Sequence, residues 1–528
     1  MTTMNRFFLG ALAAVAIGAG TPSHAQTLRF ASQGDAQTMD PHSQNHGLTN
    51  SINQHVYDYL IARDKQLNFV PCLAVSWEQV SQLKWRFKLR PGVKFHDGSA
   101  FNADDVVFSI NRAKEPTSQL SVYANAVGKP KKIDDTTVEF DLAKVNPIFL
   151  EHLQGLFIMS KAWSEKNKVV KPQDFKNKEE TFAVLNANGT GPFMLVKREP
   201  GIKTTWKRNP NYWGKIEGNV QEVVFTPIGN DATRSAALIS GELDFVLDPP
   251  PRDVARLRNT AGVKVVDGPE NRVIFIGMDQ FRDELQYSNV KGKNPFKDLR
   301  VRKALYHAVD IETVKAKLMN GQSFPTGAMT PSPKADFFDP AIEARWPFDL
   351  ALARKLMAEA GYPNGFEVQL DCPTNRYIQD EGICVALAAM WDKIGVKIKV
   401  VTAPIVTYFP KLEKYEASMY MLGWGGAVTD AETTLTPVMR NPGPNGIGSY
   451  NYGRSTNAKF DELAAKSSVE PDVAKRKELI LAALTEWKEQ VHTIPLHRQV
   501  IPWAARSNVT VSHRADNFFV WEWVTIGK

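Results

Sequence analysis

Residues that could catalyse a reaction are sparse in this sequence. Two adjacent acidic pairs, Asp283-Glu284 and Asp380-Glu381, have the carboxylates needed for general acid–base chemistry, but surface acids show the same spacing. The glycines of Gly446-Ile447-Gly448 lack the third glycine and the preceding strand of a dinucleotide site. The sequence contains no GxSxG, HExxH or GxxxxGK motif. These patterns disfavour catalysis and leave a hydrolytic enzyme as the remote alternative.

Histidines near the N-terminus are the best candidates for metal ligands. His42 and His46 lie four residues apart in DPHSQNHG, beside Asp40, and imidazole suits nickel. The flanking proline and glycine predict a loop, so helical i,i+4 spacing does not apply there. His492 and His497 form a second, more distant pair. We therefore predict no resident metal and no other cofactor, and keep a nickel chelate among the alternative ligands.

Arg376 and Tyr377 are candidates for direct contact with a ligand. They follow the predicted strand Phe366–Leu370, and loops at the carboxyl ends of strands are where α/β folds place binding groups. The guanidinium of Arg376 could hold a carboxylate through two parallel hydrogen bonds, and a surface salt bridge is the competing interpretation. Further candidates are Tyr450 in a glycine-rich loop, and Asn45 and His46 after the first predicted strand.

The sequence has three cysteines, and two of them are close together. Cys372 and Cys384 flank PTNRYIQDEGI, and a disulfide between them would tie the end of a strand to the start of a helix. The alternative is two unpaired thiols that pack as small hydrophobic side chains. Cys72 is then the odd cysteine, and we expect it to be buried.

The N-terminus has the pattern of a secretory signal. Arg6 supplies a positive charge, Phe7–Ala19 is apolar, and Ser23-His24-Ala25 places small residues where a signal peptidase reads them. This pattern predicts cleavage after Ala25. The apolar run is shorter than the roughly 20 residues that span a bilayer, which disfavours a membrane anchor. Because no cysteine follows to carry a lipid, we expect a free periplasmic protein.

Length and charge narrow the class of protein further. A chain of 528 residues exceeds the roughly 250–300 at which one core stops growing, so two or three domains are expected. The net charge of +7 is spread along the chain among acidic residues, which predicts a solvated surface and no binding of nucleic acid. Nothing in the pattern indicates an oligomer, so a monomer is expected.

Strand and helix patterns alternate through the chain, which predicts a mixed α/β fold. The segment Lys84–Ala113 shows this most clearly. Trp85, Phe87 and Leu89 alternate with basic residues, and the pattern resumes after a Pro-Gly turn, which predicts a hairpin. Asn102 then has the position of a helix N-cap. Further upstream, Leu48–Leu60 is predicted to be a helix.

The same segment resembles the periplasmic dipeptide-, oligopeptide- and nickel-binding proteins of ABC importers, solute-binding protein family 5. The resemblance continues in the family's order over nearly the whole mature chain. Its blocks are GTGPFMLVKREPG (189–201), WKRNPNYW (206–213), ALISGELDFV (237–246), DLRVRKALYHAVD (298–310) and IGVKIKV (394–400), followed by the pair Gly423-Trp424.

This resemblance implies a two-lobed α/β fold with a ligand cleft between the lobes. It also implies a function: capture of a peptide or peptide-like compound by hinge closure, and delivery to the membrane permease of an ABC importer. A nickel chelate, an opine or a sugar conjugate would be the alternative ligand on the same fold. Mapped onto this chain, the parts are a signal peptide (1–25), a first-lobe main domain (26–60, 189–272 and 500–528), an inserted domain (61–188) and a second lobe (273–499).

The resemblance also assigns roles around the Gly-Trp pair. Trp424 should line the cleft and stack on the ligand. In peptide-binding relatives, an acidic residue three positions after this tryptophan holds the ligand's α-ammonium, but here that position is Ala427. A buried ammonium without a carboxylate costs several kcal/mol. Either Asp430 or Glu432 replaces the missing acid, or the ligand has no free α-amine.

Overall fold

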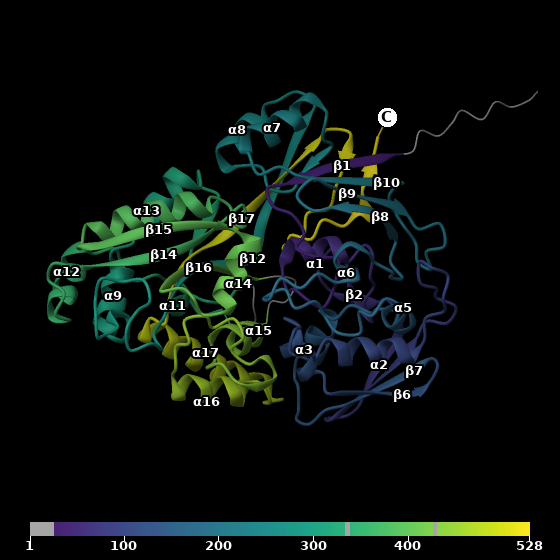
Figure 1. Cartoon of the computed structure of the whole chain (residues 1–528), viewed down its shortest axis with the longest axis horizontal. Coiled ribbons are helices and arrows are strands. Elements are labelled where there is room, and N and C mark those ends of the chain that lie inside the picture. The colour runs from purple at the N-terminus through teal and green to yellow at the C-terminus, as the bar shows by residue number, and fades with distance from the viewer. Residues whose placement is uncertain (1–25, 333–337, 426–429, 528) are drawn as a thin grey trace, which may run out of the picture.

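The computed structural model describes residues 26–332, 338–425 and 430–527. The expected signal peptide, residues 1–25, lies outside the described residues. Two lobes lie side by side, and strands β12 and β17 run between them (Figure 1). None of the helices in the described ranges combines the length and apolarity needed to cross a membrane.

One large sheet extends through both lobes. Its central pair, β12 and β17, has antiparallel neighbours on each side, and the short strand β13 (Ser323–Pro325) pairs with β17 off the main path. In spatial order the strands are β15 (Val396–Pro404), β14 (Phe366–Thr374), β16 (Met419–Gly425), β12 (Val263–Met278), β17 (Thr493–Arg506), β11 (Phe245–Val246), β1 (Thr27–Ser32), β10 (Glu222–Pro227), β9 (Lys203–Arg208) and β8 (Phe193–Glu199).

Strands β12 and β17 are long because each serves both lobes. Their pairing runs from Val263 opposite Arg506 to Gly277 opposite Thr493, and the register shifts between Pro269 and Val273. Proline has no backbone N–H to donate to the ladder, which accounts for an irregularity at this point. Figure 1 shows β12 and β17 between the two lobes.

The first lobe contains a separate four-stranded sheet, and it corrects the predicted hairpin. Strand β5 (Lys84–Leu89) pairs with β4 (Ala74–Ser81) and β7 (Thr137–Asp141), and β6 (Lys129–Asp134) follows at the edge. The residues after the Pro-Gly turn do not pair with β5. Alternation of side chains locates the strand but cannot identify its partners, which are the preceding strand β4 and, about 50 residues later, β7.

Two local predictions had different outcomes. Asn102 caps α2 (Ala103–Arg112): its Oδ1 accepts from the N–H of Asp104, and the Asp105 carboxylate accepts from the N–H of Asn102, which confirms the predicted N-cap. The helix predicted over Leu48–Leu60 is wrong in extent, since α1 covers only Gly47–Asn53.

Close backbone approach explains the short helix. The N–H of Gly191 donates to the carbonyl of Val56, and a Cβ at Gly189 would lie 1.8 Å from that same oxygen. Only glycine permits this contact, so Gly189 and Gly191 pack directly against the backbone of the buried residues that follow α1. The remaining first-lobe helices are α3 (Ser121–Ala126), α4 (Phe149–Gln154), α5 (Lys161–Lys166), α6 (Phe182–Leu185), α7 (Asp231–Ser240) and α8 (Pro251–Arg258).

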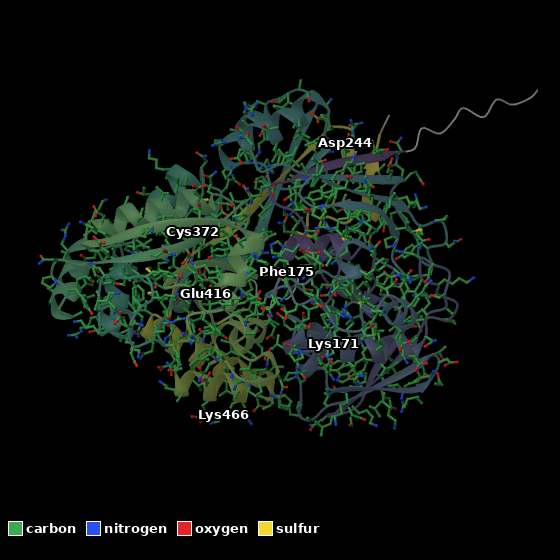
Figure 2. All side chains as sticks on the ribbon, viewed as in Figure 1. Lys171, Phe175, Asp244, Cys372, Glu416 and Lys466 are labelled. Atoms are coloured by element: carbon green, nitrogen blue, oxygen red, sulfur yellow. A yellow bond between two sulfur atoms is a disulfide. The ribbon has the colours of Figure 1, made fainter. Side chains whose placement is uncertain are left out.

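The second lobe contains the expected strand–helix–strand unit. Strands β14 and β15 are parallel and are connected by α13 (Asp380–Asp392). Cys372 Sγ in β14 and Cys384 Sγ in α13 form a disulfide, and Cys372 is labelled within this lobe in Figure 2. Other helices of this lobe are α9 (Leu299–His307), α12 (Leu350–Glu359), α14 (Ile405–Glu413), α16 (Ala458–Ser467) and α17 (Val473–Gln490).

Removal of the disulfide should destabilise the second lobe. The bridged residues are 12 apart, and closing a loop of this size contributes about 3 kcal/mol on the chain-entropy model. We expect Cys372→Ala/Cys384→Ala to lower the thermal midpoint of the mature protein in calorimetry. Reductant should lower the midpoint of the wild type and leave the double variant unchanged; an equal response of both proteins would contradict the assignment.

Candidate functional site

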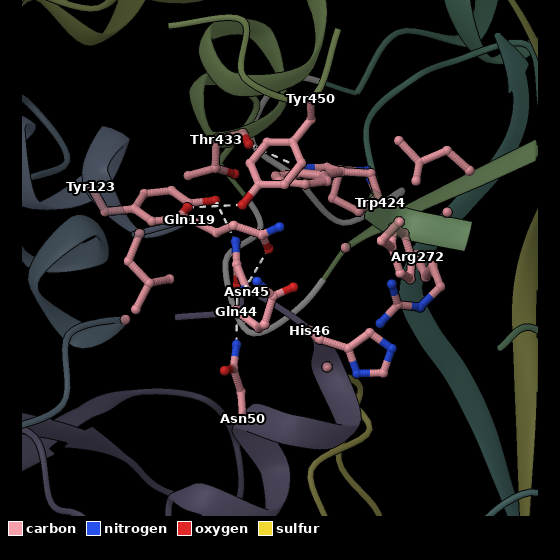
Figure 3. A pocket seen from close by; sticks show the side chains of 18 of the residues that line it. Gln44, Asn45, His46, Asn50, Gln119, Tyr123, Arg272, Trp424, Thr433 and Tyr450 are labelled. Carbon is pink, nitrogen blue, oxygen red and sulfur yellow. Dashed lines mark hydrogen bonds between the residues drawn. The ribbon is translucent and has the colours of Figure 1, made fainter. Parts of the chain in front are cut away.

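A cavity lies between the two lobes, and together with the open space at its mouth it measures about 1140 Å³. Six of the residues selected from the sequence line it: Asn45, His46, Arg376, Tyr377, Trp424 and Tyr450. Figure 3 shows several of these side chains converging on one space from opposite sides. Asp430 is not among the lining residues, and Ala427 lies outside the described residues.

A buried ion pair holds the first-lobe loop that carries Asn45 and His46. Arg112 of α2 donates two hydrogen bonds of 2.7 Å to the carboxylate of Asp40, and both side chains are fully buried. Burial opposes ionisation of Asp40, but the charge and hydrogen bonds of Arg112 outweigh it, so the pKa of Asp40 is lowered. The loop is therefore held in place by an ion pair from which solvent is excluded.

Asn45 connects the loop to its neighbours around the cavity. Its N–H donates to Gln119 Oε1 at 2.9 Å, and its Oδ1 accepts from Asn50 Nδ2 at 3.1 Å. Its Nδ2 lies 3.5 Å from the hydroxyl of Tyr123 (Figure 3). These contacts orient the amide of Asn45 at the cavity wall.

Two arginines and a histidine form a basic end of the cavity. Arg272 of β12 donates from Nε to Glu270 at 2.9 Å, whereas Nε of Arg376 is buried without a partner among the described residues. Burial lowers the pKa of Arg376 to about 10, which still leaves it charged at neutral pH. Burial and the two arginine charges hold the pKa of His46 well below its usual value. The arrangement presents an incompletely neutralised cation to a ligand.

The loop of Arg376 is positioned by one of the acids that the sequence offered for catalysis. Asp380 Oδ2 accepts from the backbone N–H groups of Arg376 and Tyr377 at 2.9 and 3.1 Å. Burial raises the pKa of Asp380 to about 6. This carboxylate therefore shapes the binding loop, and its hydrogen-bonding capacity is used on backbone groups.

Aromatic side chains form the second-lobe wall. Trp424 Nε1 donates to the carbonyl of Thr433 at 2.9 Å, and its ring centroid lies 4.6 Å from that of Tyr450. The hydroxyl of Tyr377 donates to the carbonyl of Gly423 at 3.3 Å. With their polar atoms thus occupied, these rings offer π faces and edges to a ligand.

Both acids that could replace the carboxylate missing at Ala427 are already paired. Asp430 accepts from Arg476 Nη1 and Nη2 at 2.8 and 2.6 Å, and it caps the N–H of Glu432. Glu432, in α15 (Glu432–Thr434), accepts from His152 Nε2 across the cleft at 3.0 Å. Neither carboxylate lines the cavity.

The protonation of His152 follows from its neighbours. The amide of Asn146 is oriented by two backbone groups, since Nδ2 donates to Ala126 O at 2.9 Å and Oδ1 accepts from Ile148 N at 3.1 Å. The same Nδ2 donates to Nδ1 of His152 at 3.0 Å. His152 therefore carries its proton on Nε2 and donates it to Glu432 as a neutral imidazole.

A second bridge joins the lobes beside the cavity. Gln119, from the first lobe, donates from Nε2 to Glu413 Oε1 at the end of α14, and its carbonyl accepts from the Tyr450 hydroxyl at 2.8 Å. Burial raises the pKa of Glu413 to about 7. Together with the bond between His152 and Glu432, these contacts exist only while the lobes are closed.

The histidines do not assemble a metal site within the described ranges. His42 is buried between Arg112 and the carbonyl of Phe157, and its pKa is lowered to about 4, chiefly by burial. His492 and His497 are also buried, and burial lowers the pKa of each to about 3. Of the histidines singled out, His46 is the one that lines the cavity.

Several lining residues gave no recognisable signal in the sequence. Arg272 lies in a long crossing strand, and Gln119 and Glu151 lie near short helices of the first lobe, so no local pattern marks them. Only the tertiary fold of the first lobe brings them together at the cavity, which the second lobe then completes. The residues missed in this way are Gln37, Gln44, Gln119, Tyr123, Glu151 and Arg272.

A two-lobed α/β protein with a cavity between its lobes, lined by polar and aromatic side chains, has the architecture of a solute-binding protein. The model of the bacterial extracellular solute-binding proteins, family 5, matches residues 68–446. This chain belongs to that family.

Individual relatives agree with this assignment over most of their length. The chain is 30% identical to heme-binding protein A of Haemophilus influenzae, over 85% of this chain and 83% of the relative. It is 27% identical to the dipeptide-binding protein of Escherichia coli, over 91% and 90%. Its fold matches a periplasmic binding protein of Helicobacter pylori, solved with the peptide STSA, with a TM-score of 0.84, 23% identity and coverage of 95% and 98%.

Proposed function

We propose that this protein is the periplasmic substrate-binding component of an ABC importer for peptides or peptide-like compounds. It is exported by the signal peptide, cleaved after Ala25, and acts as a monomer that catalyses no reaction. The domain division given above, with its inserted domain at 61–188, describes its two lobes. The relatives named for dipeptides and heme support an organic ligand with carboxylate groups.

Arg376 carries this proposal, because its buried Nε has no hydrogen-bond partner among the described residues. A guanidinium in a cavity closed by both lobes needs a counter-charge, and a ligand carboxylate provides it with matching planar geometry. Arg272 adds a second positive charge beside it. Tyr377, Trp424 and Tyr450 supply the apolar surface that covers the body of the ligand.

Capture follows from contacts that one lobe alone cannot make. The ligand touches Asn45 and His46 on the first lobe and Arg376 and Trp424 on the second, so it binds the closed state more tightly than the open state. Binding therefore shifts the population toward closure, and the closed form docks on the permease.

A ligand screen tests the proposed function. The mature protein, unfolded and refolded to remove carried-over ligand, is heated with peptides, modified amino acids, sugars and nickel chelates. A ligand at 100 times its dissociation constant should stabilise the protein by about 2.7 kcal/mol. Stabilisation by acidic peptides or conjugates is the expected result; stabilisation only by sugars or nickel chelates would overturn the peptide assignment.

Loss of the His152 contact should weaken every ligand by a similar factor. His152→Ala removes a charge-assisted hydrogen bond made only in the closed state, so the closed population falls and apparent affinity falls with it. We expect about a 10-fold increase in each dissociation constant, measured by calorimetry, with a larger radius of gyration in small-angle scattering. His152→Gln, which keeps a donor, should preserve closure; a loss confined to one ligand class would contradict this role.

A further inference from the structure

Glu151 is an acidic residue at the wall of the cavity. It lies on α4 in the first lobe, and among the described lining residues it is the one carboxylate. Its Oε2 pairs with Arg63, which is also fixed by the carbonyl of Leu67 and the ring of Phe69. The Glu151 side chain is still 19% exposed, so it retains a surface toward the cavity.

The surroundings of Glu151 carry an excess of negative charge. Three carboxylates meet here from the two lobes, since the charge of Asp430 acts on Glu151 and Glu432 follows in the same turn. Two arginines, Arg63 and Arg476, pair with the first two of these acids. The third acid, Glu432, receives its hydrogen bond from a neutral imidazole, because His152 Nδ1 is an acceptor. Three negative and two positive charges leave one negative charge beside the cavity.

The acidic and basic ends of the cavity have separate electrostatic partners. The charges acting on Glu151 come chiefly from Arg63 and Asp430. Those acting on Arg376 come chiefly from Arg272, Glu270 and Asp380, apart from its neighbour Tyr377. A ligand in this cavity therefore meets a negative end and a positive end.

Unpartnered polar atoms in the same cavity indicate that the ligand is polar between those ends. Gln37 lines the cavity and is 8% exposed, yet neither Oε1 nor Nε2 of its amide has a partner among the described residues. Nε2 of His46, which is 5% exposed, is also without a partner. Buried amides and imidazoles normally find hydrogen bonds, so a bound molecule is expected to supply them.

We propose that Glu151 is an ammonium-binding subsite, and that the ligand carries a free ammonium at this end and a carboxylate at the arginine end. The inference rests on the proposed function, and it relocates recognition of the amine from the second lobe to the first. The Glu151 carboxylate belongs to the first lobe, whereas Ala427 belongs to the second. Glu151 supplies the negative charge that the segment after Gly423-Trp424 lacks. The ligand class is then a zwitterionic peptide-like compound.

The test compares dipeptides with their N-acetyl derivatives on three proteins. Wild type, Glu151→Gln and the control Glu165→Gln are titrated by calorimetry with a panel of dipeptides in both forms; Glu165 is an exposed acid of the same lobe. We expect wild type and Glu165→Gln to prefer the free amine, and Glu151→Gln to lose affinity for it by about 10- to 100-fold. Affinity for the acetylated form should change little in Glu151→Gln.

Each other outcome has a definite meaning. Retention of the preference in Glu151→Gln would overturn the subsite, and equal or tighter binding of acetylated peptides by wild type would overturn it while the proposed function stands. Absence of binding by either form to every protein would remove the proposed function and the subsite with it. If Glu151→Gln folds poorly, Arg63→Gln/Glu151→Gln removes both partners and leaves no guanidinium unpaired.

Discussion

Replacement of Arg376 by glutamine should abolish high-affinity binding of acidic ligands. Glutamine keeps a polar side chain but removes the charge that faces the cavity with its Nε unpartnered. Truncating one side of a buried charged pair costs about 2–5 kcal/mol, which corresponds to a loss of roughly 30- to 4000-fold in affinity. The measurement is isothermal titration of the variant with the best acidic ligand from the screen.

Two companion variants make this result specific. Arg354→Gln changes an arginine of the same lobe that is bound to the carbonyl of Lys393 on the surface, and it should leave affinity unchanged. Arg376→Lys keeps the charge but loses the planar donor pair, so it should recover only part of the affinity. Full affinity in Arg376→Gln, with its fold intact by circular dichroism, would show that the carboxylate binds elsewhere.

Replacement of Arg112 by alanine should destabilise the first lobe more than any exposed change. It leaves the carboxylate of Asp40 buried without its partner, and such a loss costs about 3–5 kcal/mol. Urea denaturation followed by far-ultraviolet circular dichroism should show the loss at neutral pH. Because the pKa of Asp40 is lowered in the folded state, this stabilisation is present above the ordinary aspartate pKa and disappears as the pH falls through the lowered value.

Two control variants separate the effect of the lost charge on stability from the effect of the lost side-chain volume. Arg256→Ala removes an exposed arginine and should have little effect on the urea midpoint. Asp40→Asn/Arg112→Leu removes both charges, and it should be more stable than Arg112→Ala because no unpaired ion remains. Equal destabilisation of the single and double variants would instead assign the effect to packing alone.

The Arg376 and Arg112 variants test the two sides of the same cavity. The Asp40–Arg112 pair fixes the first-lobe loop of Asn45 and His46, whereas the disulfide and Asp380 fix the second-lobe loop of Arg376. Ligand recognition thus depends on two loops held by bonds that do not involve the ligand. Preorganised loops of this kind lower the ordering cost of binding.

The sequence by itself determined the class of the elements and many of their positions. Alternation of apolar residues placed β5 and β14, the Asn102 cap placed α2, and the spacing of Cys372 and Cys384 allowed their pairing. These signals are local, because they depend on side-chain periodicity and on backbone groups a few residues away. The series of different family-like sequence blocks along the chain also indicated the family.

Tertiary structure alone decided strand partners and the chemistry of the cavity. One neighbour of β5 is β7, about 50 residues later in the chain, and the extent of α1 is set by two glycines more than 100 residues later. The pairing of Asp430 with Arg476 depends on the fold of the second lobe, and the contact of Glu432 with His152 depends on closure of one lobe on the other. The same closure completes the cavity that Glu151 lines. A carboxylate has the same local sequence signal whether it is paired or free, because its partner is chosen by the fold.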